Sequence, residues 1–381
     1  MKSHHQAIID IADGVDRFMR RAFTSITVDG PELDAEEFQK HPHMIVSTHR
    51  SHVDYYMAGY MLIFRGFKHL RFAAGSNLTK LPYIGPRFRA FGAFTVEREI
   101  AFERNYVKNL CNSVVTMMEN REAVLVFPEG GRSYSNSILE VKSGILGAAV
   151  LMQARLDARL HARSPDQEVL LLPMAISYEC PPDAKWFGLL LAGKRLRKHM
   201  QPFFKRLLGN VLYFGADILA FAPFLMAPKT GRKYGEVFID YGAPLSIRSI
   251  VDIDANRAAG ARDPFFEHRA SMQKVAEVMR HQFFALYRLL PMHVLAYVMR
   301  GESAIDTATA AARMPAVLEA LAEAGKNKKS LDGRTPAQLV EEGTRQLERL
   351  GAITVRGSVL RVRRQRIVQY CSTPVIDDPR S

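Results

Sequence analysis

Short apolar runs alternate with segments of helical spacing over most of the first 250 residues. Runs of strand length lie near residues 43–48, 70–74, 93–97, 123–127, 168–177 and 237–241, and helix-like segments include residues 51–65, 100–119 and 143–156. Strands separated by helices favour a parallel sheet with functional loops at the carboxyl ends of the strands. The pattern therefore predicts an α/β fold with helices flanking a mostly parallel central sheet.

The pattern changes character after about residue 250. Residues 265–300 have helical spacing, an alanine-rich stretch runs from Ala304 to Ala324, and residues 335–350 predict a further helix. The runs Ile353–Val355 and Val359–Val362 predict a β-hairpin around Arg356–Ser358. A helix followed by a basic hairpin is typical of part of a winged helix, which is the main support for a nucleic-acid-binding alternative.

These patterns divide the chain into three predicted regions. Residues 1–30 form an N-terminal amphipathic helical segment, 31–250 the main α/β domain, and 251–381 a helical region with the hairpin. The N-terminal helix, over residues 5–24, is expected either to lie on a membrane through its basic end or to pack on the main domain.

An insert over residues 185–233 is expected to face a membrane. Its stretch 207–228 holds Asp217 as its one charge, but it also holds two glycines and two prolines, and basic residues flank both sides. Equal basic flanks argue against crossing the bilayer. We expect this stretch to dip into one leaflet or to line an apolar groove; a buried core hairpin is the alternative.

The charge balance indicates an anionic partner. The formal net charge is +13, whereas the hydrophobic content of 48% and the charged content of 24% are ordinary for a globular protein. A strong positive balance favours nucleic acid, acidic lipid or a phosphorylated substrate, without choosing among them. The three cysteines, Cys111, Cys180 and Cys371, lie far apart without metal-binding spacing, which argues against a disulfide framework and for a reducing compartment.

One segment places a histidine and a carboxylate where a strand gives way to a helix. The run Met44–Val46 is followed by Ser47-Thr48-His49-Arg50-Ser51-His52-Val53-Asp54. Ser51 is the expected helix cap, with Asp54 in the first turn. The Asp54 carboxylate then points back at the loop of His49 and can hold the imidazole in one tautomer, as in a catalytic triad. A hydroxyl of the substrate would stand in place of the serine.

A second apolar strand, Val124–Phe127, ends in a turn whose residues are suited to binding a ligand. The turn reads Pro128-Glu129-Gly130-Gly131-Arg132-Ser133. Glycines let backbone N–H groups approach a ligand closely, and arginine presents a planar fork suited to phosphate. Alone the turn is weak evidence for a functional site, but together with the His49–Asp54 segment it is strong evidence for one.

In order along the chain, four segments resemble the four blocks of the glycerolipid acyltransferases. They are His49–Asp54, Gly92-Ala93-Phe94, Glu129–Ser133 and Pro173–Glu179. The His-Arg-Ser-x-x-Asp form and the Ile-Ser-Tyr-Glu ending resemble most closely the membrane-associated glycerol-3-phosphate acyltransferases and their dihydroxyacetone-phosphate relatives. The resemblance covers roughly residues 40–245, and Arg366–Ser372 is similar to a tyrosine-containing segment of the same branch.

The chain departs from this family at two charged positions. Glu97 stands where the second block commonly has an arginine, and Tyr134 stands where the third block often has one. Both missing charges would lie near the phosphate of the acceptor. The resemblance therefore carries the chemistry of acyl transfer more firmly than the identity of the acceptor.

The resemblance implies that His49 is the general base and that Asp54 fixes its tautomer. The other expected contacts to the substrate are, in chain order, Arg50, Ser51, Arg98, Glu129, Gly130, Gly131, Arg132, Ser133 and Lys142. The acyl donor would be a thioester of coenzyme A or of acyl carrier protein, without a further cofactor and without a metal. The acceptor would be glycerol 3-phosphate or, alternatively, lysophosphatidate or another lipid alcohol, and the enzyme would act on the cytoplasmic face of an anionic membrane as a peripheral or monotopic protein.

Several of these residues also have a plain structural interpretation. Glu129 can brace its turn or bond to Arg50, and Arg132 can pair with Glu129. Lys142 can be a solvated residue at the start of a helix, and Tyr178 and Glu179 can be residues at the end of a strand.

Overall fold

The computed structural model describes most of the chain, in several stretches. The described residues are 14, 16–79, 84–90, 92–97, 103–159, 167–184, 224, 226–227, 231, 233–255 and 264–378. The expected phosphate ligand Arg98, the expected helix before residue 14 and nearly all of the stretch 207–228 lie outside the described residues. No helix in these stretches is both long and apolar enough to cross a bilayer.

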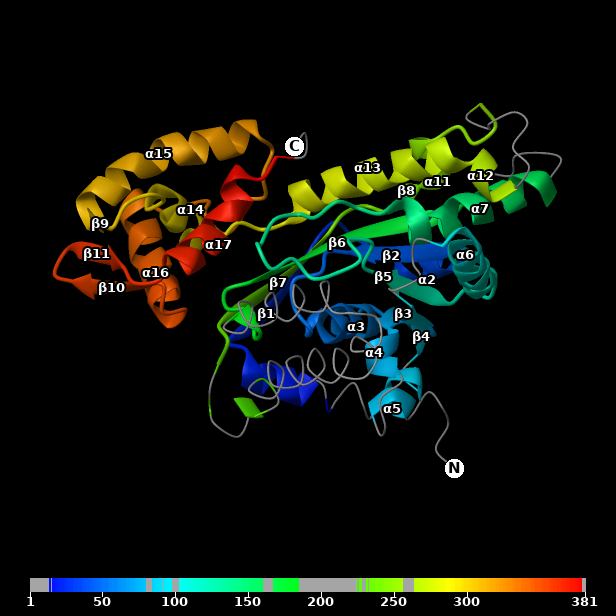
Figure 1. Cartoon of the computed structure of the whole chain (residues 1–381), viewed down its shortest axis with the longest axis horizontal. Coiled ribbons are helices and arrows are strands. Elements are labelled where there is room, and N and C mark those ends of the chain that lie inside the picture. The colour runs from blue at the N-terminus through cyan, green and yellow to red at the C-terminus, as the bar shows by residue number, and fades with distance from the viewer. Residues whose placement is uncertain are drawn as a thin grey trace, which may run out of the picture.

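A central sheet forms the scaffold of the molecule (Figure 1). Within the described residues its strands are β1 (Ser25–Asp29), β2 (His43–Ser47), β3 (Leu70–Gly75), β4 (Ala93–Val96), β5 (Ala123–Val126), β6 (Leu170–Tyr178), β7 (Glu236–Tyr241) and β8 (Leu245–Ser246). Their order across the sheet is β1-β7-β6-β2-β5-β3-β4, with β8 beside β6. β2, whose five residues are all buried, therefore lies at the centre.

Most strands of this sheet run in parallel. β2 pairs in parallel with β5 and β6, and β3 pairs in parallel with β4 and β5. β7 runs antiparallel to β6, and β1 runs parallel to β7, so one side of the sheet reverses direction. The predicted α/β fold with a mostly parallel central sheet is confirmed.

Helices cover both faces of the sheet because successive strand residues point to opposite faces. Ile45 packs in one apolar cluster with Met57 and Met61 of α3 (Asp54–Phe64). Met44 and Val46 pack in a second cluster with α6 (Arg104–Glu119), α7 (Ser143–Arg159) and α13 (Arg269–Leu286). The strands in between need apolar side chains on both faces, which explains their unbroken apolar runs.

The remaining described helices surround the sheet or follow it in the chain. They are α2 (Ala35–Lys40), α4 (Ser76–Thr79), α5 (Ile84–Ala90), α11 (Ile247–Ile250), α12 (Pro264–Glu267), α14 (Pro291–Val298), α15 (Thr307–Glu323), α16 (Pro336–Arg349) and α17 (Gln365–Ile376). The predicted helical region 265–300 is thus divided among three helices, and Pro291 begins the last of them.

The C-terminal part forms a smaller body beside the sheet, at the left of Figure 1. The predicted hairpin is confirmed as β10 (Ile353–Arg356) and β11 (Val359–Val362), and β11 also pairs with β9 (Ala304–Asp306) in a three-stranded antiparallel sheet. The apolar cluster beneath α3 continues into this body through Leu295, Leu339 and Leu360, which joins the two parts through one core.

Candidate active site

Three loops meet at one edge of the sheet, where β2, β5 and β6 end. Because these strands are parallel neighbours, the residues that follow Ser47, Val126 and Tyr178 lie on the same edge. The main chain of His49 joins two of the loops, since its N–H donates to the Glu129 carboxylate at 3.0 Å and its carbonyl accepts the Ser133 N–H at 2.9 Å. The two segments singled out in the sequence are therefore one site.

His49 and Asp54 form the pair that their spacing predicts. Nδ1 of His49 lies 2.8 Å from Oδ2 of Asp54, and both side chains are buried. A carboxylate at Nδ1 places the proton there, so Nε2 carries the lone pair that can accept a proton. The His49 ring also packs at 4.6 Å between ring centroids against Phe127, which limits its rotation.

Asp54 is held by three further donors. Its Oδ2 accepts the N–H groups of Arg50 at 2.5 Å and Ser51 at 2.9 Å, and its Oδ1 accepts the Tyr178 hydroxyl at 2.6 Å. The prediction that Ser51 caps the helix is wrong, because the helix begins at Asp54 after Val53 and has no side-chain cap. Asp54 itself binds the backbone N–H groups ahead of the helix, which folds the loop around its carboxylate.

Glu129 is a fully buried brace between the loops. Its Oε2 accepts the His49 N–H, its Oε1 accepts the Leu139 N–H at 3.2 Å, and Oε1 lies 3.6 Å from Nη2 of Arg50. Burial raises the pKa of the Glu129 carboxyl to about 7, against the lowering effect of the Arg50 guanidinium. The bracing role weighed for Glu129 in the sequence is thus present in the structure.

Gly130 needs to be a glycine at this turn. Its φ of +70° lies in the left-handed region, and an added Cβ would come within 3.0 to 3.2 Å of the Lys142 side chain. Its N–H donates to the Phe127 carbonyl at 3.1 Å, which closes the turn. Gly130 also lines the cavity described below, whereas Gly131 has open space where a Cβ would stand.

Arg132 is engaged within the protein. Its Nη1 donates to Asp183 at 2.7 Å, its Nη2 donates to the Tyr134 hydroxyl at 2.9 Å, and its guanidinium lies over the Tyr134 ring. Asp183, on the segment after β6, also accepts the Ser51 hydroxyl at 2.8 Å. Asp183 therefore ties the loop of His49 to the loop of Arg132, and the tyrosine that departs from the family pattern binds the arginine beside it.

Arg50 lies beneath the loops and is almost fully buried. Its Nη1 donates to the Ser137 carbonyl at 2.5 Å, and its guanidinium lies 5.0 Å from the centroid of the Tyr287 ring. Burial raises the pKa of Tyr287 to about 12, so this phenol stays neutral. With Glu129 nearby, Arg50 is placed to hold the loops together more than to meet a ligand in solution.

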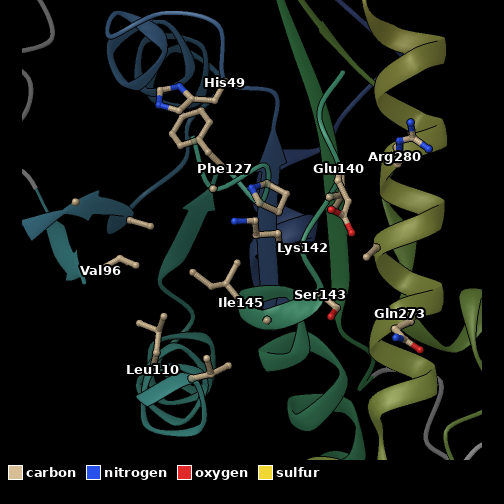
Figure 2. Close-up of a pocket in the computed structure, with 18 of the residues that line it drawn as sticks. His49, Val96, Leu110, Phe127, Glu140, Lys142, Ser143, Ile145, Gln273 and Arg280 are labelled. Carbon is tan, nitrogen blue, oxygen red and sulfur yellow. The ribbon is translucent and has the colours of Figure 1, made fainter. Parts of the chain in front are cut away.

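A cavity of about 720 Å³ opens beside His49 and is large enough for a sizeable ligand. Figure 2 shows apolar side chains from three elements along one wall, Val96 at the end of β4, Leu110 of α6 and Ile145 of α7. Phe127 lies next to His49 at the same opening. The cavity thus combines a basic imidazole with an extended apolar wall.

The charged lining of this cavity differs in part from the expected set. Lys142 is exposed and projects into the cavity in Figure 2, with Glu140 and Arg280 on the side of α13. Arg50, Ser51, Arg132 and Ser133 lie behind this lining and build the loops. Of the predicted cations that the structure describes, Lys142 is the one that reaches the cavity, and Arg280 of α13 joins it there.

The sequence predictions missed the supporting role of residues distant in the chain. Asp183 and Tyr287 carry no local pattern of their own, and only the fold brings them to the loops. Tyr178 ends β6, as the strand-end interpretation predicts, and this position at the end of the strand is the signal that could indicate its contact with Asp54. Within the described stretches, no group of three or more His, Cys, Asp or Glu side chains is arranged to hold a metal ion.

A family model described as Acyltransferase matches residues 25–177. This range holds β1 through β6, and thus all three strands whose ends build the site. His49, Asp54 and the turn Glu129–Ser133 all lie inside it.

Curated relatives match more than half of the chain. A protein named glycerol-3-phosphate acyltransferase from Xanthomonas axonopodis pv. citri is 27% identical over 211 residues, which is 55% of this chain and 21% of the relative. Proteins of the same name from Aeromonas hydrophila and Colwellia psychrerythraea are 28% and 27% identical, each over 61% of this chain and 25% of the relative. The chain thus spans about a quarter or less of the length of these relatives.

Proposed function

Because residues 25–177 match the acyltransferase family, we propose that the chain transfers a long acyl group from a thioester to a hydroxyl of glycerol 3-phosphate, as the names of its relatives suggest. The observation that carries the proposal is the buried His49–Asp54 pair at the opening of an apolar-walled cavity. The relatives bear the name of this activity, which supports the choice of acceptor.

The proposed reaction needs no acyl-enzyme. His49 Nε2 takes the proton of the acceptor hydroxyl while the hydroxyl oxygen bonds to the thioester carbonyl carbon. The tetrahedral intermediate then collapses, the carbon–sulfur bond breaks, and the departing sulfur receives the proton from His49. Asp54 keeps the imidazole oriented through both steps and stabilises its positive charge. Since Gly130 donates to Phe127, the Gly131 N–H is our candidate donor to the oxyanion.

The cavity offers places for both substrates. The apolar wall of Val96, Leu110 and Ile145 suits a hydrocarbon chain, whereas Lys142 and Arg280 suit a phosphate. The donor is a thioester of coenzyme A or acyl carrier protein, and no separate cofactor takes part. Lysophosphatidate or another lipid alcohol is the alternative acceptor, which the Glu97 and Tyr134 departures permit.

We place the enzyme on the cytoplasmic face of an anionic membrane, as a peripheral or monotopic protein. The net charge of +13 supports attraction to such a surface, and the product of the proposed reaction is itself an anionic lipid. The segment 185–233 remains our predicted membrane-facing insert.

Acyl transfer by purified protein tests the proposal. Long-chain acyl-CoA and an acyl carrier protein thioester are each offered with glycerol 3-phosphate or lysophosphatidate, and product is measured for the native chain and for His49→Ala. Loss of the general base is expected to lower kcat by about 10²–10⁴-fold or more. The matched control is His281→Ala, which removes an exposed histidine of α13 and is expected to keep full activity.

Each outcome separates the alternatives. Product from glycerol 3-phosphate that disappears with His49 supports the proposal, whereas product from lysophosphatidate alone assigns the second acceptor. Full turnover by His49→Ala in a preparation free of host acyltransferase rules out His49 as the general base. Salt-sensitive DNA binding that is lost on truncation near residue 330, without transfer to either acceptor, would favour a nucleic-acid-binding protein.

A further inference from the structure

The C-terminal body has the chain topology of a winged helix. Helix α14 is followed by strand β9, helices α15 and α16, and then the hairpin β10–β11. The hairpin pairs with β9 through Leu360 and Ile305, which gives the sheet order β10-β11-β9. The winged-helix piece that the sequence indicated is therefore part of a full arrangement of three helices and three strands. The hairpin is its wing.

Exposed arginines concentrate on this wing and on the segment after it. We call the set the wing arginines; all five are exposed, and they are Arg356, Arg361, Arg363, Arg364 and Arg366. No aspartate or glutamate occurs between Gly351 and Ile376. Among the described residues none of the wing arginines forms an ion pair with a carboxylate, whereas Arg313 and Arg349 of neighbouring helices do.

The pairing of the hairpin places its arginines on one face. Val355 pairs with Leu360, which is fully buried, so these two side chains lie on the face turned toward the core. Arg356 pairs with Val359 and Arg361 pairs with Thr354, so both arginines lie on the opposite, outward face, where their guanidinium groups can meet phosphates.

The same body is poorly suited to duplex DNA. In the helix-turn-helix arrangement the second helix, here α16, enters the major groove. Its exposed positions include Glu341 and Glu348 as well as Arg345, and the exposed Glu319 and Glu323 lie on α15, so exposed acids outnumber this arginine. These carboxylates would be repelled by the DNA phosphates when the helix approaches the groove. A flat anionic surface that meets the wing alone avoids this repulsion.

We propose that the wing is a membrane-docking site that binds anionic phospholipid headgroups through the wing arginines. The proposal deepens the proposed membrane location and rests on it, but it does not depend on acyl transfer. In Figure 1 the wing lies at the end of the molecule away from α6 and α7, two of the helices that line the cavity. Changes in the wing should therefore leave the catalytic loops intact.

Vesicle co-sedimentation of the full chain tests the site. The vesicles are phosphatidylcholine alone, or phosphatidylcholine mixed with phosphatidylglycerol, and the variant is R356S/R361S/R363S. Since each cation near an anionic surface contributes roughly a fivefold gain in binding, loss of three is expected to weaken binding to the mixed vesicles on the order of 100-fold. Val355→Ser, on the opposite face of the hairpin, is expected to leave vesicle binding nearly unchanged, and added salt is expected to weaken native binding.

The matched control removes the same charge elsewhere. R269S/R300S/R345S changes three exposed arginines outside the wing, and it is expected to change vesicle binding far less than the wing variant. Circular dichroism and acyl transfer to glycerol 3-phosphate from a soluble thioester, measured in detergent, check that both variants remain folded.

The outcomes decide between docking by the wing and its competitors. Equal loss of vesicle binding in both triple variants would mean that net charge alone matters, and unchanged binding in the wing variant would place the docking surface elsewhere; either result overturns the proposal. Wing-dependent binding to a fluorescent DNA duplex without vesicle binding assigns the wing to nucleic acid instead. Because the transfer assay in detergent is separate, a failure of docking leaves the proposed reaction testable by itself.

Discussion

Two buried carboxylates, those of Asp54 and Asp183, fix the positions of the loops around His49. Asp54 collects four donors from the loop, His49 and β6, and Asp183 joins Ser51 to Arg132. A buried carboxylate is stable only when its oxygens are paired, so each of these groups fixes the positions of its partners. The geometry of the base therefore depends on residues well beyond the catalytic pair.

Asp183→Asn tests whether Arg132 faces the acceptor. The amide oxygen can still accept the Ser51 hydroxyl, but the buried guanidinium loses the negative charge of Asp183, which is expected to cost about 3–5 kcal/mol of unfolding free energy. If Arg132 contacts the acceptor phosphate, glycerol 3-phosphate replaces the missing charge. Its stabilisation of the variant, measured as a shift in Tm, is then expected to exceed its stabilisation of the native chain. Equal shifts in both proteins would place Arg132 outside the acceptor site.

Glu129→Gln tests the buried brace through its pH dependence. The folded chain holds the Glu129 proton until a pH of about 7, whereas the unfolded chain releases it near its ordinary pKa of 4.5. Between these values the folded state binds more protons, so its unfolding free energy falls as pH rises. Urea unfolding at a series of pH values is expected to show the native chain losing stability relative to Glu129→Gln across that window. Parallel curves of unfolding free energy against pH for the two proteins would contradict a Glu129 carboxyl that stays protonated up to a pH of about 7.

At the residue scale, the sequence predicts what is local. His49 and Asp54 lie on one turn, so their contact follows from spacing. The pairing of Asp183 with Ser51 joins residues 132 positions apart, and no periodicity encodes it. Arg132 and Asp183 are likewise distant in the sequence. The sequence therefore predicts a phosphate contact for Arg132 and not the hydrogen bond to Asp183 that the folded chain contains.

The elements of the sheet differ in how well their patterns define them. The central strands have long apolar runs because both of their faces are covered, and their predicted positions agree with β2, β5 and β6. β1 is the outermost strand on its side of the sheet and contains serine, threonine and aspartate, so no apolar run marks it in the sequence. The reversed direction of β7 depends on its pairing with β6, which the strand sequence does not encode.

Arg288 joins these elements to the C-terminal helices. It lies between α13 and α14, its Nε and Nη2 donate to Asp240 of β7, and Nη2 also donates to Asp29 of β1 at 2.6 Å. Its backbone N–H donates to the Ser177 hydroxyl of β6 at 3.0 Å. One side chain thus connects the two reversed strands to the chain segment that leads into the winged-helix body.

Arg288→Ala is expected to lower the unfolding free energy by about 3–5 kcal/mol, because it leaves the buried Asp240 without its partner. Denaturant unfolding measures the loss, and Arg300→Ala, an exposed arginine beyond α14, is expected to stay within about 0.5 kcal/mol of the native chain. A loss in Arg288→Ala no larger than that of the control would mean that the buried pair contributes little net stability.

Across the whole molecule, positive charge is distributed unevenly. The net charge of +13 predicts an anionic partner but not its location, because composition carries no position. The folded chain pairs many arginines with carboxylates, as at Arg132 and Arg288, and it gathers exposed arginines on the wing. The three-region division of the chain stays a prediction, and the apolar cluster shared by the sheet and the C-terminal body couples any such regions energetically.

The reversal of direction at the β6–β7 pair determines at which end of the sheet the chain enters β7 and β1. β6 ends at the catalytic edge with Tyr178, and β7 and β1 start from that same edge at Glu236 and Ser25. The chain therefore leaves β6, and enters β7 and β1, at the end of the sheet that carries the catalytic loops. A change in the length of the connection between β6 and β7 would alter the surroundings of the base, whereas the opposite ends of the strands would keep their connections.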